Sequence, residues 1–172
     1  GPDSRCEVTP TGGARNLPIF AALMSRTDKQ QVATLLGSAD LEKQNTADVE
    51  LQKTLSGKDF FLYSDFAQTS EADIEDLFEV DFYLDLVNAA YRDFLAKPLG
   101  KGLLRGRSVR IVELTSQALK SMPLKNNFTF DRCVPARLFA VQCSSLKDRI
   151  SKETYARFEK IAKALNTLKD DQ

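Results

Sequence analysis

Apolar residues in the first half of the chain gather in short runs of strand length, with polar segments between them. The two clearest runs span residues 31–36, ended by Gly37, and residues 59–64, and a polar segment with a weak apolar stripe at about 42–55 separates them. Runs of this length are typical of buried strands, and an amphipathic segment between them is typical of a crossover helix. A shorter extended run at residues 6–9 precedes a helix that Asn16 caps. Strand, helix and strand in this order predict a parallel sheet flanked by helices.

The second half of the chain has the spacing of helices. Apolar residues recur at intervals of three and four over residues 82–95, and Pro98 ends that helix. Residues 109–113 suit one more short strand, Pro135 suits the first turn of a helix that runs towards Leu146, and Ser151 can cap the last helix. The apolar face of that last helix consists of Tyr155, Phe158, Ile161, Leu165 and Leu168.

These elements predict an α/β fold in three consecutive parts. Residues 5–96 form an α/β domain, residues 97–114 form a basic, glycine-rich loop with a short strand, and residues 115–170 form a helical C-terminal part. A chain of 172 residues is long enough to enclose one domain core. It opens with Gly1-Pro2-Asp3-Ser4 and no initiator Met, as the scar of a cleaved affinity tag does, so we expect a piece of a longer protein.

The composition excludes several classes of protein. Hydrophobic residues make up 42% and charged residues 28% of a chain with zero net charge, which is ordinary for a globular protein and unlike a general nucleic-acid-coating protein. No apolar run approaches the roughly 18 residues that span a bilayer, so we expect no membrane partner. The chain has no His and only three cysteines (Cys6, Cys133 and Cys143), which excludes the usual zinc sites and His-dependent catalysis. Few cysteines and no visible signal peptide favour a cytoplasmic protein.

Carboxylates are concentrated in the middle of the chain. Nine of them lie in residues 59–91, with no Lys or Arg among them, and they are densest in residues 71–78, which we call the acidic segment. Carboxylate oxygens near the end of a parallel strand are the ligands that Mg²⁺ prefers, and this edge of a sheet is a common place for a substrate pocket. The alternative is that these acids stabilise a helix N-terminus through its dipole, while the remainder are solvated.

A second charged stretch, residues 97–110, is basic and glycine-rich, and we call it the basic segment. No acid occurs between Asp93 and Glu113, so its side chains can hold a nucleic-acid phosphate backbone, although such segments are more often solvated loops or mobile excursions. Gly102 to Ser108 lacks the spacing and the Lys of a Walker A loop, which excludes an ATP site there. The candidate nucleic-acid contacts are Lys97, Lys101, Arg105, Arg107 and Arg110.

Several short motifs resemble one family. The acidic segment reads EADIEDLF and is followed by FYL at 82–84 and LVN at 86–88, which is similar to the Toprim signature of OLD-family (overcoming lysogenization defect) ATPases. Further motifs resemble that family in the same order: VTP at 8–10, GG at 12–13, LPIF at 17–20, the Pro135-Ala136 pair, and Thr154, Phe158 and Asn166 of the closing helix. The likeness covers most of residues 8–168 and implies a Toprim-like parallel sheet.

Members of that family join an N-terminal ABC-type ATPase to a C-terminal Toprim nuclease that cleaves DNA with a divalent metal. The resemblance implies metal ligands at a Glu on the first strand, which would precede Cys6, at a D-x-D after a later strand, and at an acid of the IED type. Glu75 matches the last of these, with Asp73 and Asp76 nearby. Gly-Ser-Ala at 37–39 stands where the D-x-D is expected, and Asp40 is the nearest acid. The implied ligands of Mg²⁺ (or Mn²⁺) are therefore these four acids, with Glu75 and Asp40 as the catalytic candidates.

Three functions remain open. A degenerate Toprim region can serve as a scaffold or interaction surface in DNA metabolism or anti-phage defence. An active nuclease would need displaced acids such as Asp40 and Asp48, because two-metal cleavage requires several carboxylates around ions roughly 3.5–4 Å apart. A role unrelated to either is the third. The partners that the resemblance implies are the N-terminal ATPase domain of the parent chain and DNA, and we also expect that a second copy can pair with the chain.

Overall fold

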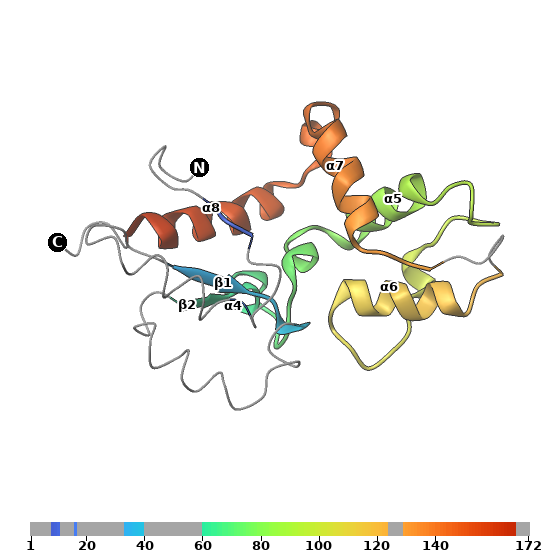
Figure 1. The fold of residues 1–172 in the computed structure, drawn as a ribbon, viewed down its shortest axis with the longest axis horizontal. Coiled ribbons are helices and arrows are strands. Elements are labelled where there is room, and N and C mark those ends of the chain that lie inside the picture. The colour runs from blue at the N-terminus through green and yellow to red at the C-terminus, as the bar shows by residue number, and fades with distance from the viewer. Residues whose placement is uncertain (1–7, 11–15, 17–32, 40–59, 124–128, 168–172) are drawn as a thin grey trace. The chain divides into compact units, whose positions relative to one another are not determined.

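The computed structural model describes residues 8–10, 16, 33–39, 60–123 and 129–167 (Figure 1). The chain divides into two compact units, each with its own internal packing. The first consists of Gly1–Asp73 together with Ala156–Gln172, and the second consists of Ile74–Tyr155. The three consecutive parts that the sequence predicts stay a prediction.

The two apolar runs of the first unit form neighbouring parallel strands. Strand β1 (Thr34–Leu36) pairs with β2 (Phe60–Leu62), with Leu35 opposite Phe61. The expected parallel pairing is thus confirmed, and the described part of the chain is an α/β fold. The second run is shorter than predicted, because helix α4 (Tyr63–Ala67) begins at its end. The carboxylate of Asp65 accepts a hydrogen bond from the Leu62 N–H at 3.0 Å, which turns the chain out of the strand.

Other sequence predictions for the first unit have different outcomes. Val8 and Thr9 lie outside any strand, so the expected strand at residues 6–9 is wrong in its described half. Asn16 forms part of a short 3₁₀ turn, and the helix expected after it lies outside the described residues. The helix expected at about 42–55 also lies outside them.

Helix α5 (Val80–Ala90) organises the second unit and follows a single 3₁₀ turn, η2 (Ile74–Leu77). The prediction of a helix here is confirmed, but α5 ends five residues before Leu95. The chain turns at Tyr91, whose carbonyl accepts the N–H groups of both Phe94 and Leu95. This turn brings Leu95 and Leu99 back onto the core that α5 begins, where both are buried.

Residues 109–113 are not a strand, which corrects the prediction. Helix α6 (Ile111–Lys120) begins there, and Val109 is exposed. The buried positions of α6 are Ile111, Thr115, Ala118 and Leu119, which recur at the spacing of one helical face. The short apolar run at the start of α6 is compatible with both a strand and a helix, whereas the spacing of apolar residues over ten positions indicates a helix.

The C-terminal helices agree with the sequence. Helix α7 (Cys133–Leu146) covers the predicted range, and a 3₁₀ turn, η4 (Lys147–Arg149), joins it to α8 (Lys152–Thr167). The hydroxyl of Ser151 accepts the N–H of Thr154 at 3.0 Å, as an N-cap does, so the predicted cap is confirmed. On the predicted apolar face Ile161 is buried and Phe158 and Leu165 are half-buried, but Tyr155 is exposed, and Leu168 lies outside the described residues.

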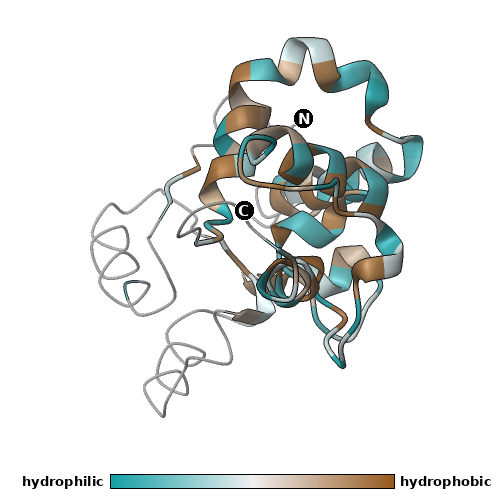
Figure 2. Cartoon of the chain, turned by 90° about the vertical axis from the view of Figure 1, so that its right-hand side faces the viewer, coloured by the Kyte–Doolittle hydropathy of each residue, from teal (hydrophilic) through white to brown (hydrophobic). Residues whose placement is uncertain are grey.

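Two apolar clusters hold the second unit together. Brown apolar positions alternate with teal polar ones around its helices in Figure 2. The larger cluster joins α5 to α6 and consists of Tyr83, Leu84, Val87, Tyr91, Leu95, Leu99, Ile111, Ala118, Leu119 and Met122. The smaller cluster joins α5 to α7, where the Phe139 ring packs edge-on against the rings of Phe78 and Phe82. Within the described residues, no helix combines the length and apolar character needed to cross a bilayer.

Candidate functional site

The segment that follows β1 lies directly against the start of the acidic segment. The Ser38 N–H donates to the Ala72 carbonyl at 2.8 Å, and the Ala72 N–H donates to the Ser38 hydroxyl at 2.9 Å. The Ala39 N–H donates to the Asp73 carboxylate at 3.1 Å. The structure therefore brings together two of the segments in which the family resemblance expects metal ligands. The contacts between them are hydrogen bonds to the backbone.

Gly37 fits this arrangement because it has no side chain. A Cβ atom at position 37 would lie 2.4 Å from Oδ1 of Asp73, which is closer than real contacts allow. Asp73 is only 3% exposed, so its carboxylate cannot move into solvent without leaving its buried position. The space that the first acid of a D-x-D would need is thus filled by the carboxylate of Asp73.

Glu75 is bound by an arginine. Glu75 is 9% exposed as a whole residue, and its Oε1 accepts a hydrogen bond from Nε of Arg132 at 2.8 Å. A second, short bond joins Nη2 of Arg132 to Oε2 of the same carboxylate. Arg132 directly precedes α7, so this two-point ion pair fastens η2 to the N-terminal end of that helix.

Asp76 supplies a helix cap from outside the helix. Its Oδ1 accepts the backbone N–H of Ile111, the first residue of α6, at 2.7 Å. Arg110, the residue at the N-cap position of α6, makes no capping bond with its own side chain. A carboxylate at this end of a helix satisfies an otherwise unpaired donor and is favoured by the helix dipole.

The remaining acids do not complete a metal site among the described residues. Asp40 and Asp48 lie outside these residues, and Asp65 is bonded at the start of α4. In the part of the chain that the structure describes, no three Cys, Asp or Glu side chains come close enough to hold one ion. Mg²⁺ takes six oxygen ligands, and here three acids of the acidic segment already serve the protein's own donors. The described donor set does not fit the implied metal.

Tyr83 is a polar residue of this region that the sequence predicts only as part of an apolar face. It is 3% exposed, and its hydroxyl has no hydrogen-bond partner among the described residues. Burial raises the pKa of this hydroxyl well above its usual range, and the negative charge of Glu75 raises it further, while Arg132 lowers it. A phenol without a partner beside an ion pair could not have been identified from helical spacing.

The first part of the basic segment is tethered to α5 through Leu99 and Lys101. The amide of Asn88 donates to the Leu99 carbonyl at 2.9 Å and accepts the Leu99 N–H at 2.7 Å. Nζ of Lys101 lies 2.8 Å from a carboxylate oxygen of Asp81, at the other end of the helix. The chain from 91 to 101 thus returns along α5 and is held at two points.

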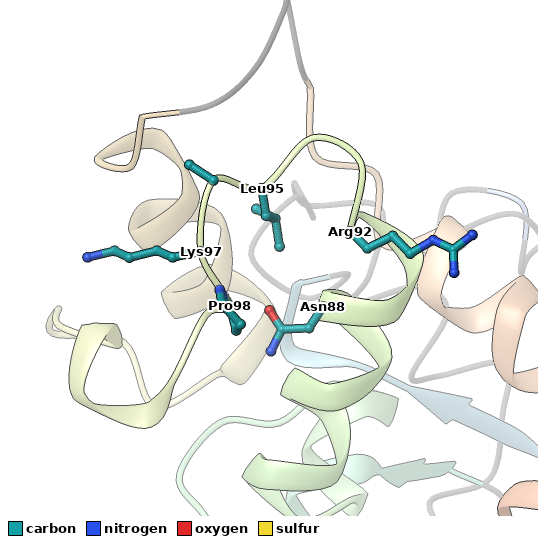
Figure 3. A pocket seen from close by; sticks show the side chains of 6 residues that line it. Asn88, Arg92, Leu95, Lys97 and Pro98 are labelled. Carbon is teal, nitrogen blue, oxygen red and sulfur yellow. The ribbon is translucent and has the colours of Figure 1, made fainter.

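A small open pocket lies where the segment leaves α5, lined by Asn88, Arg92, Leu95, Ala96, Lys97 and Pro98. Figure 3 shows that the charged ends of Arg92 and Lys97 point away from each other, on opposite sides of the pocket. The Asn88 amide is occupied by Leu99. An anion-binding site needs donors that converge, so this pocket is not one.

The predicted nucleic-acid contacts differ in exposure. Lys97, Arg105 and Arg107 are exposed, and Lys101 is exposed and paired with Asp81. Arg110 is buried, and its Nη2 lies 3.1 Å from a carboxylate oxygen of Glu113, which removes it from the exposed set. The hydroxyl of Ser108 and the charge of Arg110 hold the pKa of Glu113 below its usual range.

Comparison with known proteins adds no further assignment to these residues. The chain matches no protein-family model, and neither the search of curated proteins nor the search of solved structures returns a match.

Proposed function

We propose that this chain is a Toprim-like domain that acts by binding and not by catalysis, as a structural or interaction domain in DNA metabolism or anti-phage defence. The observation that supports this proposal is that the acids of the acidic segment bind other groups of the protein. Asp73 binds the segment after β1, Glu75 binds Arg132, and Asp76 caps α6. Each of these three acids contributes here to the packing of a different part of the chain.

Two-metal cleavage of a phosphodiester requires carboxylates that are free to hold both ions. Releasing these acids would break the ion pair of buried Glu75 with partly exposed Arg132 and leave two backbone donors without acceptors, each at a cost in stability. The same residues therefore cannot serve both purposes without rearrangement. This conflict favours the non-catalytic reading over an active nuclease that uses Asp40 and Asp48.

The test is a nicking assay on supercoiled plasmid with Mg²⁺ or Mn²⁺, using the full chain. We expect no cleavage above the buffer control, and no change on Glu75→Gln. Asp148→Asn, at an exposed acid outside the acidic segment, is the matched control. Metal-dependent nicking that is lost in Glu75→Gln or in Asp40→Asn, and kept in the control, would establish the active nuclease instead.

For the partner of this domain we propose the ATPase domain of the parent chain, or a second copy, before DNA. The chain has zero net charge and therefore no general electrostatic attraction to DNA, which supports a protein partner. Sedimentation velocity should show self-association of the chain, or a complex with the separately expressed N-terminal ATPase domain of the parent protein. A monomer that binds neither would refute this order of partners.

A specific observation also favours nucleic-acid contact as a second candidate function. Asp81 and Asn88 are seven residues apart on α5, which is roughly 10 Å along a helix axis. The returning chain binds at both positions, which holds the first part of the basic segment, including exposed Lys97, against α5. Lys97, Arg105 and Arg107 are the exposed cations of this segment, and exposed cations on a supported segment suit contact with a phosphate backbone.

Fluorescence anisotropy with a labelled duplex tests this surface. Charge reversal of Lys97, Arg105 and Arg107 together should weaken binding and reduce the salt dependence of the affinity by roughly 2–3 in the log–log slope. The matched control reverses three exposed lysines elsewhere, Lys120, Lys147 and Lys152, and so changes the net charge equally. Equal loss of affinity in both triple variants would mean that net charge, and not this surface, determines binding.

A further inference from the structure

Glu75 is a carboxylate whose charge the fold itself must balance. Its side chain is 11% exposed, whereas that of Arg132 is 37% exposed, so the arginine is the more solvent-exposed partner of the pair. Both carboxylate oxygens are bonded to this one group, through Nε and through Nη2. A planar guanidinium matches a carboxylate at two points, and it keeps its charge at every pH at which the protein is folded.

The surroundings of this pair are poor in further metal ligands. Asp76, the next residue, gives an oxygen to the N–H of Ile111. The nearby Tyr83 hydroxyl is buried and stays protonated at neutral pH, because burial and the charge of Glu75 raise its pKa. A neutral phenol is a weak ligand for a hard cation, which prefers charged oxygens. One guanidinium therefore supplies the positive charge that the sequence resemblance would assign to a metal ion.

From this geometry we infer that Arg132 is a built-in counter-ion that takes the place of a divalent cation at Glu75. The pair clamps η2 to the first turn of α7, 57 positions further along the chain. This inference deepens the proposed function, since it identifies what makes the carboxylate unavailable. It also makes Arg132 a positioning residue whose loss is felt in the packing of α7 and not in any chemical step.

A double-mutant cycle with the full chain tests the clamp. Arg132→Gln leaves a buried carboxylate without its partner and should lower the melting temperature by roughly 6–20 °C. Glu75→Gln should lower it less, because the partly exposed arginine can be solvated. The double variant, which carries both changes, should melt above Arg132→Gln alone, since neither charge is then left unpaired. Additive losses would overturn the inference.

The charge exchange Glu75→Arg with Arg132→Glu guards against a single variant that fails to fold. Recovery of the melting temperature above that of either reversed single variant supports the pair as the clamp. An exchanged variant no more stable than the worse single variant contradicts it. Exposed Arg149, which is paired with Asp85 near the other end of α7, provides the control pair. Its exchange should change the melting temperature little, because both side chains are about half exposed.

Binding of Mn²⁺, measured by calorimetry on the unmodified chain and on Glu75→Gln, tests the replacement of the metal. We expect no saturable binding that depends on Glu75. Binding that Glu75→Gln abolishes would overturn the counter-ion assignment, even if no DNA were cleaved. Conversely, Mn²⁺-dependent cleavage that Glu75→Gln leaves unchanged would refute the proposed function and leave the assignment of Arg132 standing.

Discussion

The carboxylate of Asp76 and the backbone N–H of Ile111 form a 2.7 Å hydrogen bond across 35 positions of the chain. Helix α6 therefore receives its N-terminal cap from a residue that belongs to η2. Most helices are capped by the residue that directly precedes them, so the start of α6 depends on the correct placement of another element.

We predict that Asp76→Ala destabilises the chain by about 1–2 kcal/mol, because a buried helix donor loses its acceptor. The measurement is unfolding in urea, monitored by circular dichroism. Asp81→Ala serves as the control, since its exposed ion pair with Lys101 should contribute less than about 1 kcal/mol. Equal midpoints for the two variants would show that the bond to Ile111 adds nothing.

Gly37 and Gly100 offer a matched pair of substitutions. A Cβ at position 37 would meet the Asp73 carboxylate, whereas a Cβ at position 100 meets nothing within 4 Å. Gly37→Ala should therefore cost about 1–3 kcal/mol, since Asp73 or the backbone must shift. Gly100→Ala should be neutral or stabilise by about 0.4–1 kcal/mol, through the lower entropy of the unfolded chain. If thermal melting shows the same shift for both, the close approach at position 37 is not rigid.

Asn88 is predicted to control the mobility of the basic segment. Asn88→Ala removes both bonds to Leu99 and should cost about 1–3 kcal/mol. The exchange of amide hydrogens at residues 95–101 should become faster, while that in α7 should not change. If the basic segment binds a phosphate backbone, affinity for duplex DNA should also fall, because the cations are then no longer held in place. Unchanged exchange at residues 95–101 would show that other contacts hold the segment.

Removing the hydroxyl from each of two buried tyrosines should have different effects on stability at neutral pH. The Tyr91 hydroxyl donates to the Asp131 carbonyl at 2.8 Å and accepts the Asp131 N–H at 3.0 Å, whereas the Tyr83 hydroxyl has no partner among the described residues. Tyr91→Phe should therefore cost about 1–2 kcal/mol at pH 7, and Tyr83→Phe should be neutral or slightly stabilising. Chemical unfolding of both variants at one pH makes the comparison. A larger loss for Tyr83→Phe would reveal a hidden partner of that hydroxyl.

Burial also raises the pKa of Tyr91 above its usual value of 10.0. A raised pKa in the folded state means that the protonated form is favoured by folding, so its stabilisation is complete below pH 10 and is lost as the pH rises further. We expect the free energy of unfolding to decrease above about pH 10, with a smaller decrease in Tyr91→Phe. A pH profile that is identical in this variant would contradict the assignment.

The sequence predicts the longer elements better than the short ones, for physical reasons. Helices α5 and α8 have apolar faces that recur over ten or more residues, α7 has a Pro that suits its first turn, and β1 and β2 are apolar runs that suit a parallel pair. The start of α6 is a short apolar run that suits either element, and its cap at Asp76 lies far away in the chain. The end of α5 depends on Leu95 and Leu99 returning to a core that local spacing does not describe.

The candidate site shows the same division. The sequence identifies the acidic segment as unusual, and its acids do have specific contacts in the structure. What they bind could not be predicted, because the partners are the backbone N–H groups of Ala39 and Ile111 and the side chain of Arg132, which lie 34, 35 and 57 positions away. A single sequence contains no record of which distant groups meet. A motif alone therefore indicates which residue types are present, but it does not indicate which groups surround them in the fold.

The boundary between the two compact units falls inside the acidic segment, between Asp73 and Ile74. What reads as one continuous motif is thus shared between two separately packed bodies, with the bond to Ala39 in the first and the bonds to Arg132 and Ile111 in the second. A dissection of this protein into expressible fragments would gain nothing by keeping the motif whole. A fragment of residues 74–155 retains the partners of Glu75 and Asp76, whereas a cut between EADIEDLF and Ile111 leaves both acids without theirs.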